Sequence, residues 1–97
     1  MRLGKVIGKV TLSRQVESFT GGRWLVVRPL SREALAGAAA PAEPSLVCYD
    51  RLGAANGNIV GYVEGREAAQ PFEDDVPVDA YAALIVDTIN YMPPKKP

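Results

Sequence analysis

Few side chains in this 97-residue chain have the chemistry of a catalytic or metal-binding group. There is no histidine, which removes histidine-dependent triads, imidazole acid–base catalysis and most zinc or iron sites. The single cysteine, Cys48, stands between apolar neighbours in LVCYD, and no histidine is present to activate it. We therefore predict that Cys48 is a small buried hydrophobic residue, and that the chain is not an enzyme.

Two short segments contain residue types that could bind an ion or a phosphate. Glu73, Asp74 and Asp75 stand together in PFEDDV, and carboxylates are ligands for calcium or magnesium. Their spacing is not that of an EF-hand, so a solvated acidic loop is the preferred interpretation. The glycine-containing RLGAANGN lacks the Lys and the Ser/Thr of a P-loop, which favours a structural turn. We predict no metal and no cofactor at either segment.

The stretch PVDAYAALIVDTINY, residues 77–91, is apolar on both faces when arranged as a strand. Its β-branched and aromatic residues favour a strand over a helix, and Asp87 interrupts it too early for a membrane span. We predict that one face fills the interior of the domain and that the other packs on a neighbouring subunit. The predicted interior residues are Ala80, Ala82 and Leu84. The predicted interface residues are Tyr81, Ala83 and Ile85.

Four further strands are predicted, over residues 2–12, 23–30, 45–50 and 58–64. Gly4 and Gly8 on one face of the first strand, and Gly61 within the fourth, favour a curled sheet. The alanine- and proline-rich residues 31–44 predict a surface excursion with a short helix capped by Ser31. Residues 65–70 predict one helical turn. The pattern indicates a mainly β protein, either a small antiparallel barrel or a partly open one.

The predicted domain occupies residues 1–92, and residues 93–97 form a tail rich in proline and lysine. Basic and acidic residues are balanced, eleven against eleven, so net charge favours neither nucleic acid nor an anionic membrane. The opening MRLGKVIGKV has no run long enough for a signal peptide. A soluble, cytosolic protein is expected.

Several segments, in order, resemble a known family. They are the opening strand–loop–strand MRLGKVIGKVTLSRQVESFTGGRWLVVRPL, the turn and strand RLGAANGNIV, the turn GREAA, and the closing PVDAYAALIVDTINY with its Ile-x-Asp pattern at Ile85 and Asp87. This order is similar to that of the vertex proteins of bacterial microcompartment shells, the family of the ethanolamine-utilisation and carboxysome pentamers. Two features depart from the family pattern, namely Ala55 at a glycine position and the composition of residues 31–44.

The resemblance implies a five-stranded OB-like barrel that assembles into homopentamers and caps the vertices of an icosahedral shell. The implied partners are the chain itself and the hexameric and pseudohexameric shell proteins, in the bacterial cytoplasm. It also implies that a loop lies near the five-fold axis. The residues of this loop are Gly53, Ala54, Ala55, Asn56 and Gly57.

The alternative hypothesis is an OB-fold protein that binds single-stranded nucleic acid on a basic surface with aromatic rings for stacking. Candidate rings are Phe19, Trp24, Tyr49 and Tyr62, and candidate cations are Lys5, Lys9, Arg23 and Arg28. The balanced charge and the acidic PFEDD loop argue against this alternative.

Overall fold

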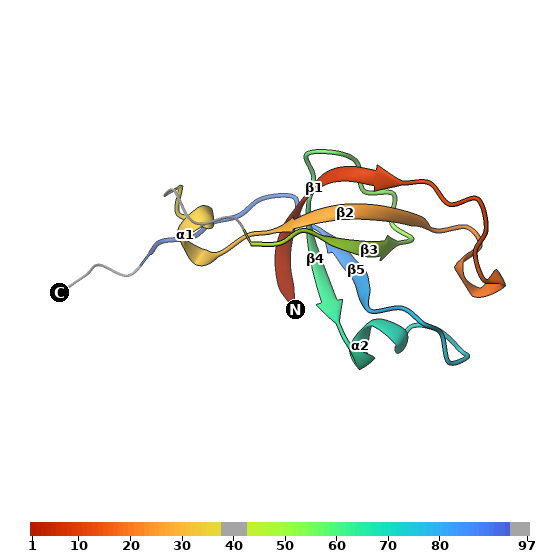
Figure 1. The fold of residues 1–97 in the computed structure, drawn as a ribbon. Helices are drawn as coiled ribbons and strands as arrows, with labels where there is room; N and C mark the ends of the chain where they lie inside the picture. Colours follow the sequence, from red (N-terminus) through yellow and green to blue (C-terminus); the bar gives the residue numbers. More distant parts are fainter. Residues whose placement is uncertain (38–42, 94–97) are drawn as a thin grey trace.

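The chain folds into a closed five-stranded barrel with short helical segments in its connections (Figure 1). The computed structural model describes residues 1–37 and 43–93, so the predicted tail lies outside the described part except for Pro93. In chain order the elements are β1 (Arg2–Val10), the 3-10 helix η1 (Glu17–Phe19), β2 (Arg23–Pro29), α1 (Arg32–Leu35), β3 (Leu46–Asp50), β4 (Ile59–Glu64), α2 (Arg66–Ala69) and β5 (Ala80–Ile85). The prediction of a mainly β barrel is confirmed.

Around the barrel the strands follow the order β1-β2-β3-β5-β4, and β4 closes onto β1. Four neighbouring pairs are antiparallel, but β3 and β5 are parallel, with Tyr49 opposite Tyr81. The predicted antiparallel arrangement thus holds for every neighbouring pair except this one. Because five is an odd number, strand direction cannot alternate all the way around a closed barrel, and one pair must be parallel.

Two strands contain one extra residue, and each extra residue changes which face the following side chains occupy. In β1, Val6 pairs with Val27 and Gly8 with Val26, so Ile7 has no partner. In β5, Ala82 pairs with Tyr62 and Leu84 with Gly61, which leaves Ala83 without a partner. Such bulges bend a strand and increase its twist, which helps a small barrel to close.

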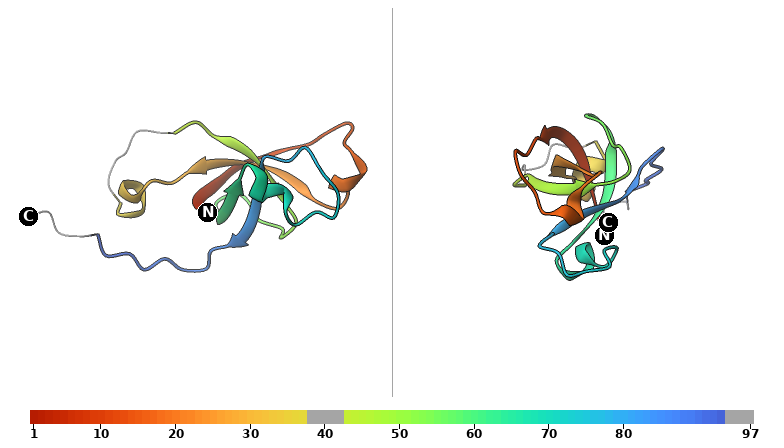
Figure 2. Two further views of the ribbon diagram at one scale, coloured as in Figure 1. Left: turned by 90° about the horizontal axis from the view of Figure 1, so that it is seen from below. Right: turned by 90° about the vertical axis from the view of Figure 1, so that its right-hand side faces the viewer.

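The closing strand is shorter than the sequence predicts. It occupies Ala80–Ile85 within the predicted 77–91, and the chain after Ile85 runs away from the barrel. Figure 2 shows this C-terminal segment leaving from the same end of the barrel as the excursion that contains α1. Residues 86–91 favour a strand by composition but do not pair with a neighbouring strand in the described part of the chain. Within that part, their one backbone hydrogen bond to the sheet is the one that Val86 N–H donates to the Ile59 carbonyl at 2.8 Å.

The buried side chains form two separate clusters, one inside the barrel and one outside it. The barrel cluster comprises Val6, Leu25, Val27, Cys48, Ala54, Val60, Tyr62, Ala80 and Ala82, with Leu46 packed against it. The outer cluster contains the buried residues Phe19, Tyr49, Ala68 and Val78, with partly buried Trp24, Val63, Ala69, Phe72, Val76 and Tyr81 against them. The η1 connection and the α2 region thus cover part of the outer surface of the barrel.

Both predicted helical turns are present. In α1 the Ser31 side chain accepts a hydrogen bond from the Ala34 N–H at 3.2 Å, which confirms the predicted cap. The second turn, α2, lies within the predicted residues 65–70. Residues 38–42 of the alanine-rich excursion lie outside the described residues. Among the helices that the structure describes, none has the length and apolarity needed to cross a membrane.

Candidate functional site

An apolar patch lies on the outer face of the barrel where β1, β4 and β5 meet. Gly61 pairs with Leu3 on one side and with Leu84 on the other, so the three residues form a row across the sheet. A Cβ atom at Gly61 would lie 2.7 Å from both Leu84 Cδ1 and Met1 Sδ, which shows how closely these side chains cover the glycine. Leu84 is nevertheless 37% exposed and Met1 71% exposed. We call Met1, Leu3, Gly61 and Leu84 the outer apolar patch.

The position of Leu84 in this patch differs from its predicted position inside the barrel. Ala80 and Ala82 are buried in the barrel as predicted, but Leu84 is on the outside. The cause is the bulge at Ala83, after which Leu84 shares a face with Gly61 and Ile85 shares the barrel-side face of Val60. Ile85 sits at the rim of the barrel, where it is 40% exposed.

The predicted interface residues are therefore in two different environments. Tyr81 packs within its own subunit, with its ring centroid 6.1 Å from that of Tyr49 and 5.9 Å from that of Phe72. The Tyr81 side chain, which remains partly exposed, is thus partly covered within its own subunit. Ala83 and Ile85 are exposed. Contact of these residues with a neighbour stays a prediction.

The loop between β3 and β4 is held in shape by a buried carboxylate. Asp50, fully buried at the end of β3, accepts hydrogen bonds from three successive backbone N–H groups. Leu52 N–H donates to Oδ1 at 2.9 Å, while the Gly53 and Ala54 N–H groups donate to Oδ2 at 3.0 and 2.9 Å. A buried carboxylate with three such donors is well satisfied without a cationic partner. The sequence analysis did not single out Asp50, although an Asp directly before a glycine-containing turn is a known signal for this arrangement.

The far end of the same loop is fixed to β1 and to Asn58. Gly57 N–H donates to the Val6 carbonyl at 2.8 Å, and Val6 N–H donates to the Asn58 carbonyl at 2.9 Å. The Asn58 side chain accepts a bond from the Ala55 N–H at 2.8 Å. The loop is consequently a rigid, hydrogen-bonded structure.

Four of the five predicted axis-loop residues are exposed, and one is not. Ala54 is only 2% exposed and belongs to the barrel cluster, so its side chain closes the end of the barrel and cannot line an axis. Gly53 and Gly57 have φ angles of +84° and +90°, a region that favours glycine. Ala55 has no positive φ, so alanine fits there without backbone strain. The position of this loop relative to a five-fold axis stays a prediction.

The structure gives Cys48 no catalytic environment. The residue is fully buried in the barrel cluster, as predicted. Burial, with the negative charge of Asp50 as a second cause, raises the pKa of the Cys48 thiol to about 12. The residues Glu73, Asp74 and Asp75 are exposed, and within residues 1–37 and 43–93 no group of three or more His, Cys, Asp and Glu is placed to hold a metal ion.

We expect Cys48 to resist thiol reagents in the folded protein. At about pH 8 its thiol stays protonated, and only the thiolate reacts, so modification should be at least about a hundredfold slower than for an unfolded cysteine. The rate of reaction with a chromogenic disulfide reagent, measured with and without denaturant, checks this expectation. Equal rates in both conditions would show that Cys48 is accessible.

The aromatic rings proposed for nucleic-acid stacking are used for internal packing instead. Tyr62 lies inside the barrel, and Phe19 and Tyr49 are buried in the outer cluster. Trp24 stands edge-on to both, with ring centroids 4.9 Å from Phe19 and 5.1 Å from Tyr49. These four side chains therefore do not form an exposed row on which successive bases could stack.

Comparison with known proteins identifies the family to which this barrel belongs. Residues 1–87 match the model of the family described as "Ethanolamine utilisation protein EutN/carboxysome". The chain belongs to the EutN/CcmL family. It is 38% identical over 91 residues to the bacterial microcompartment shell vertex protein GrpN of Rhodospirillum rubrum, covering 93% of this chain and 97% of GrpN.

Solved structures of family members have the same fold. The pentameric microcompartment shell protein GrpN from Rhodospirillum rubrum superposes with a TM-score of 0.76 at 38% identity, covering 95% of this chain and all of that one. CcmL of Gloeobacter violaceus gives a TM-score of 0.75 at 30% identity, covering 94% of this chain and 90% of that one. EutN of Escherichia coli gives 0.78 at 25% identity, covering 94% and 89%. As a family member the chain thus has the complete barrel of these relatives.

Proposed function

We propose that the chain forms a homopentamer that caps the vertices of an icosahedral bacterial microcompartment shell. The observation that carries this proposal is its 38% identity, over nearly its full length, to a protein described as a pentameric microcompartment shell protein. The outer apolar patch supports it, because exposed leucine and methionine side chains on a barrel face are suited to burial against another subunit.

Geometry explains why such a protein is needed. A flat layer of hexagonal tiles closes into a polyhedral shell only when pentagons are inserted at its vertices. A head-to-tail contact between identical subunits forms a closed ring when the rotation that relates them is one fifth of a turn. The role needs shape and contact surfaces, which agrees with the buried Cys48 and the absence of histidine.

The partners in this proposal are further copies of the chain and the hexameric and pseudohexameric shell proteins, in the bacterial cytoplasm. The loop of residues 53–57, apart from buried Ala54, is the proposed lining near the five-fold axis. The protein would bind no nucleic acid and catalyse no reaction.

Native mass spectrometry of the purified protein tests the proposal. The expected result is one species with five times the mass of the subunit, stable at micromolar concentration. A stable monomer or dimer would contradict it. Co-expression with hexameric shell proteins adds a second test, since shells should close at their vertices only when the chain is included.

We also expect no useful affinity for single-stranded nucleic acid. Balanced charge removes most of the counterion release that drives non-specific binding, and the candidate rings are packed internally. Fluorescence anisotropy with mixed oligonucleotides should show no salt-sensitive signal at low micromolar protein. A salt-dependent signal that disappears in Trp24→Ala would instead support the alternative function.

A further inference from the structure

The zero net charge of the chain conceals a strong separation of charge along the sequence. Residues 1–30, which form β1, β2 and their connection, contain six basic residues and one acidic residue, a net charge of +5. Residues 64–79, from the end of β4 through α2 to the start of β5, contain six acidic residues and one basic residue, a net charge of −5. We call these the basic hairpin and the acidic segment.

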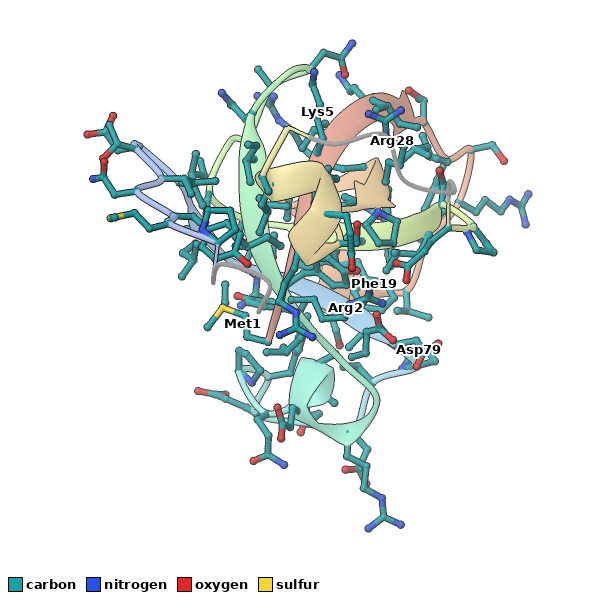
Figure 3. The ribbon with its side chains drawn as sticks, turned by 90° about the vertical axis from the view of Figure 1, so that its left-hand side faces the viewer. Met1, Arg2, Lys5, Phe19, Arg28 and Asp79 are labelled. Carbon is teal, nitrogen blue, oxygen red and sulfur yellow. The ribbon has the colours of Figure 1, made fainter. Side chains whose placement is uncertain are left out.

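The Lys5–Arg28 part of the basic hairpin and the acidic segment lie on different sides of the barrel, although the β1–β2 connection places the Phe19 ring 5.8 Å from that of Phe72 in the acidic segment. In Figure 1, β1 rises from the N-terminus to the top of the barrel, while α2 and the chain that follows it lie below. The end-on view in Figure 2 shows the same separation. Figure 3 shows Lys5 and Arg28 side by side at the top, with Asp79 at the lower right and α2 at the bottom.

Lys5 and Arg28 form an unusual pair on the basic hairpin. They stand directly opposite each other in the β1–β2 register, and both are exposed. Like charges in this position are unfavourable unless an anion lies nearby. Within residues 1–37 and 43–93 the structure has one ion pair, Arg2 with Glu43, so neither Lys5 nor Arg28 is paired with a carboxylate of these residues.

The same pair lies next to the outer apolar patch. Along β1, Lys5 is two residues beyond Leu3 and so occupies the same outer face. Specific interfaces commonly have an apolar centre and a charged rim. This outer face has such an arrangement, with Met1, Leu3 and Leu84 as its apolar part and Lys5 and Arg28 beside them as its charged part.

We propose that the Lys5–Arg28 pair docks against the acidic segment of a second copy of this chain, and that this contact sets the head-to-tail direction of the ring. The inference rests on the proposed pentamer and specifies how its subunits recognise one another. Its basis is charge complementarity, because the Lys5–Arg28 pair and the acidic segment carry opposite charges and lie on different sides of one subunit. A surface of one sign repels its own copy, so the two basic faces avoid each other and only the head-to-tail contact is favourable.

Charge reversal on each side, followed by reversal on both, tests the contact. One variant carries Lys5→Glu and Arg28→Glu, and a second carries Glu73→Lys, Asp74→Lys and Asp75→Lys. Each should raise the concentration at which half the rings dissociate by on the order of tenfold or more. A single chain with all five substitutions should regain most of the wild-type assembly, because every contact between subunits then has opposite charges again. Analytical ultracentrifugation gives the dissociation concentration, and circular dichroism confirms that each variant is folded.

A matched control separates the local contact from the effect of net charge. Arg14→Glu with Arg32→Glu changes the net charge by the same four units at two exposed positions that are not part of the Lys5–Arg28 pair, and it should leave the ring intact. The wild-type ring should also dissociate more readily as salt is raised, because screening weakens exposed charge pairs. This second measurement needs no substitution.

The outcomes distinguish this inference from the proposed function. A wild-type chain that is monomeric overturns both. If the wild type is pentameric and both charge-reversal variants form equally stable pentamers, the docking contact is overturned but the pentamer stands. The same conclusion follows if the chain with all five substitutions stays dissociated. If the variant with Lys5→Glu and Arg28→Glu keeps its ring and loses only binding to hexameric shell proteins, the basic face belongs to those proteins and the docking contact is overturned too.

Discussion

Replacing Asp50 with alanine should lower the free energy of unfolding by about 2–4 kcal/mol, because three backbone N–H groups would lose a charged acceptor. Two of these donors, at Leu52 and Gly53, can turn to water, but the Ala54 N–H is buried. Urea unfolding of the subunit, with the slope of the transition compared with wild type, gives the change in stability. Amide hydrogen exchange should be accelerated first at residues 52–54.

Two control variants accompany Asp50→Ala: Asp50→Asn, which keeps part of the interaction, and Asp87→Ala, which makes the same replacement at an exposed aspartate. Asparagine keeps the shape of Asp50 and one acceptor oxygen, so its cost should lie between wild type and alanine. Asp87 is exposed, and its replacement should change stability by no more than about 0.5 kcal/mol. If Asp50→Ala were as mild as Asp87→Ala, the carboxylate would not be what holds the loop.

The main elements of this fold were predictable because they depend on local sequence. Alternation of apolar residues and the glycine and proline positions gave all five strands in order, and Ser31 marked the start of a short helix. The mainly β barrel followed from these. The parallel β3–β5 pair was also open to prediction, since a closed barrel with five strands requires one.

The faces of the strands were less predictable, because a single extra residue inverts them. Nothing in KVIGKV or AYAALI shows that Ile7 and Ala83 lack partners; this depends on the register with β2 and β4. The prediction of Leu84 in the barrel failed for this reason alone, whereas Ala80 and Ala82, before the bulge, were assigned correctly.

Contacts between distant segments were also beyond local patterns. Phe19 packs against Tyr49 and Phe72, from three segments far apart in the sequence, with ring centroids 5.2 and 5.8 Å away. This outer cluster partly covers Tyr81, so apolarity on both faces of β5 did not by itself require a second subunit. The remaining uncovered part, Ala83 to Ile85, is where that argument still applies.

The bulge at Ala83 leads to the sharpest test of which surface is used for assembly. Ala82→Asp and Leu84→Asp place the same charge two residues apart on the two sides of β5. Ala82 is 1% exposed inside the barrel, where an unpaired carboxylate costs several kcal/mol out of a total stability of about 5–15 kcal/mol. Ala82→Asp should therefore unfold the subunit.

Leu84→Asp should instead give a folded subunit that no longer forms rings at micromolar concentration. Its side chain is 37% exposed in the monomer, so the charge can stay hydrated until association with another subunit buries it. Circular dichroism reports the fold and sedimentation velocity the ring. Leu12→Asp, at a leucine that is 44% exposed in the β1–β2 connection, is the matched control and should assemble normally. Intact rings in Leu84→Asp would show that the outer apolar patch faces solvent in the assembly, and the contact between subunits would have to be sought on another side of the barrel.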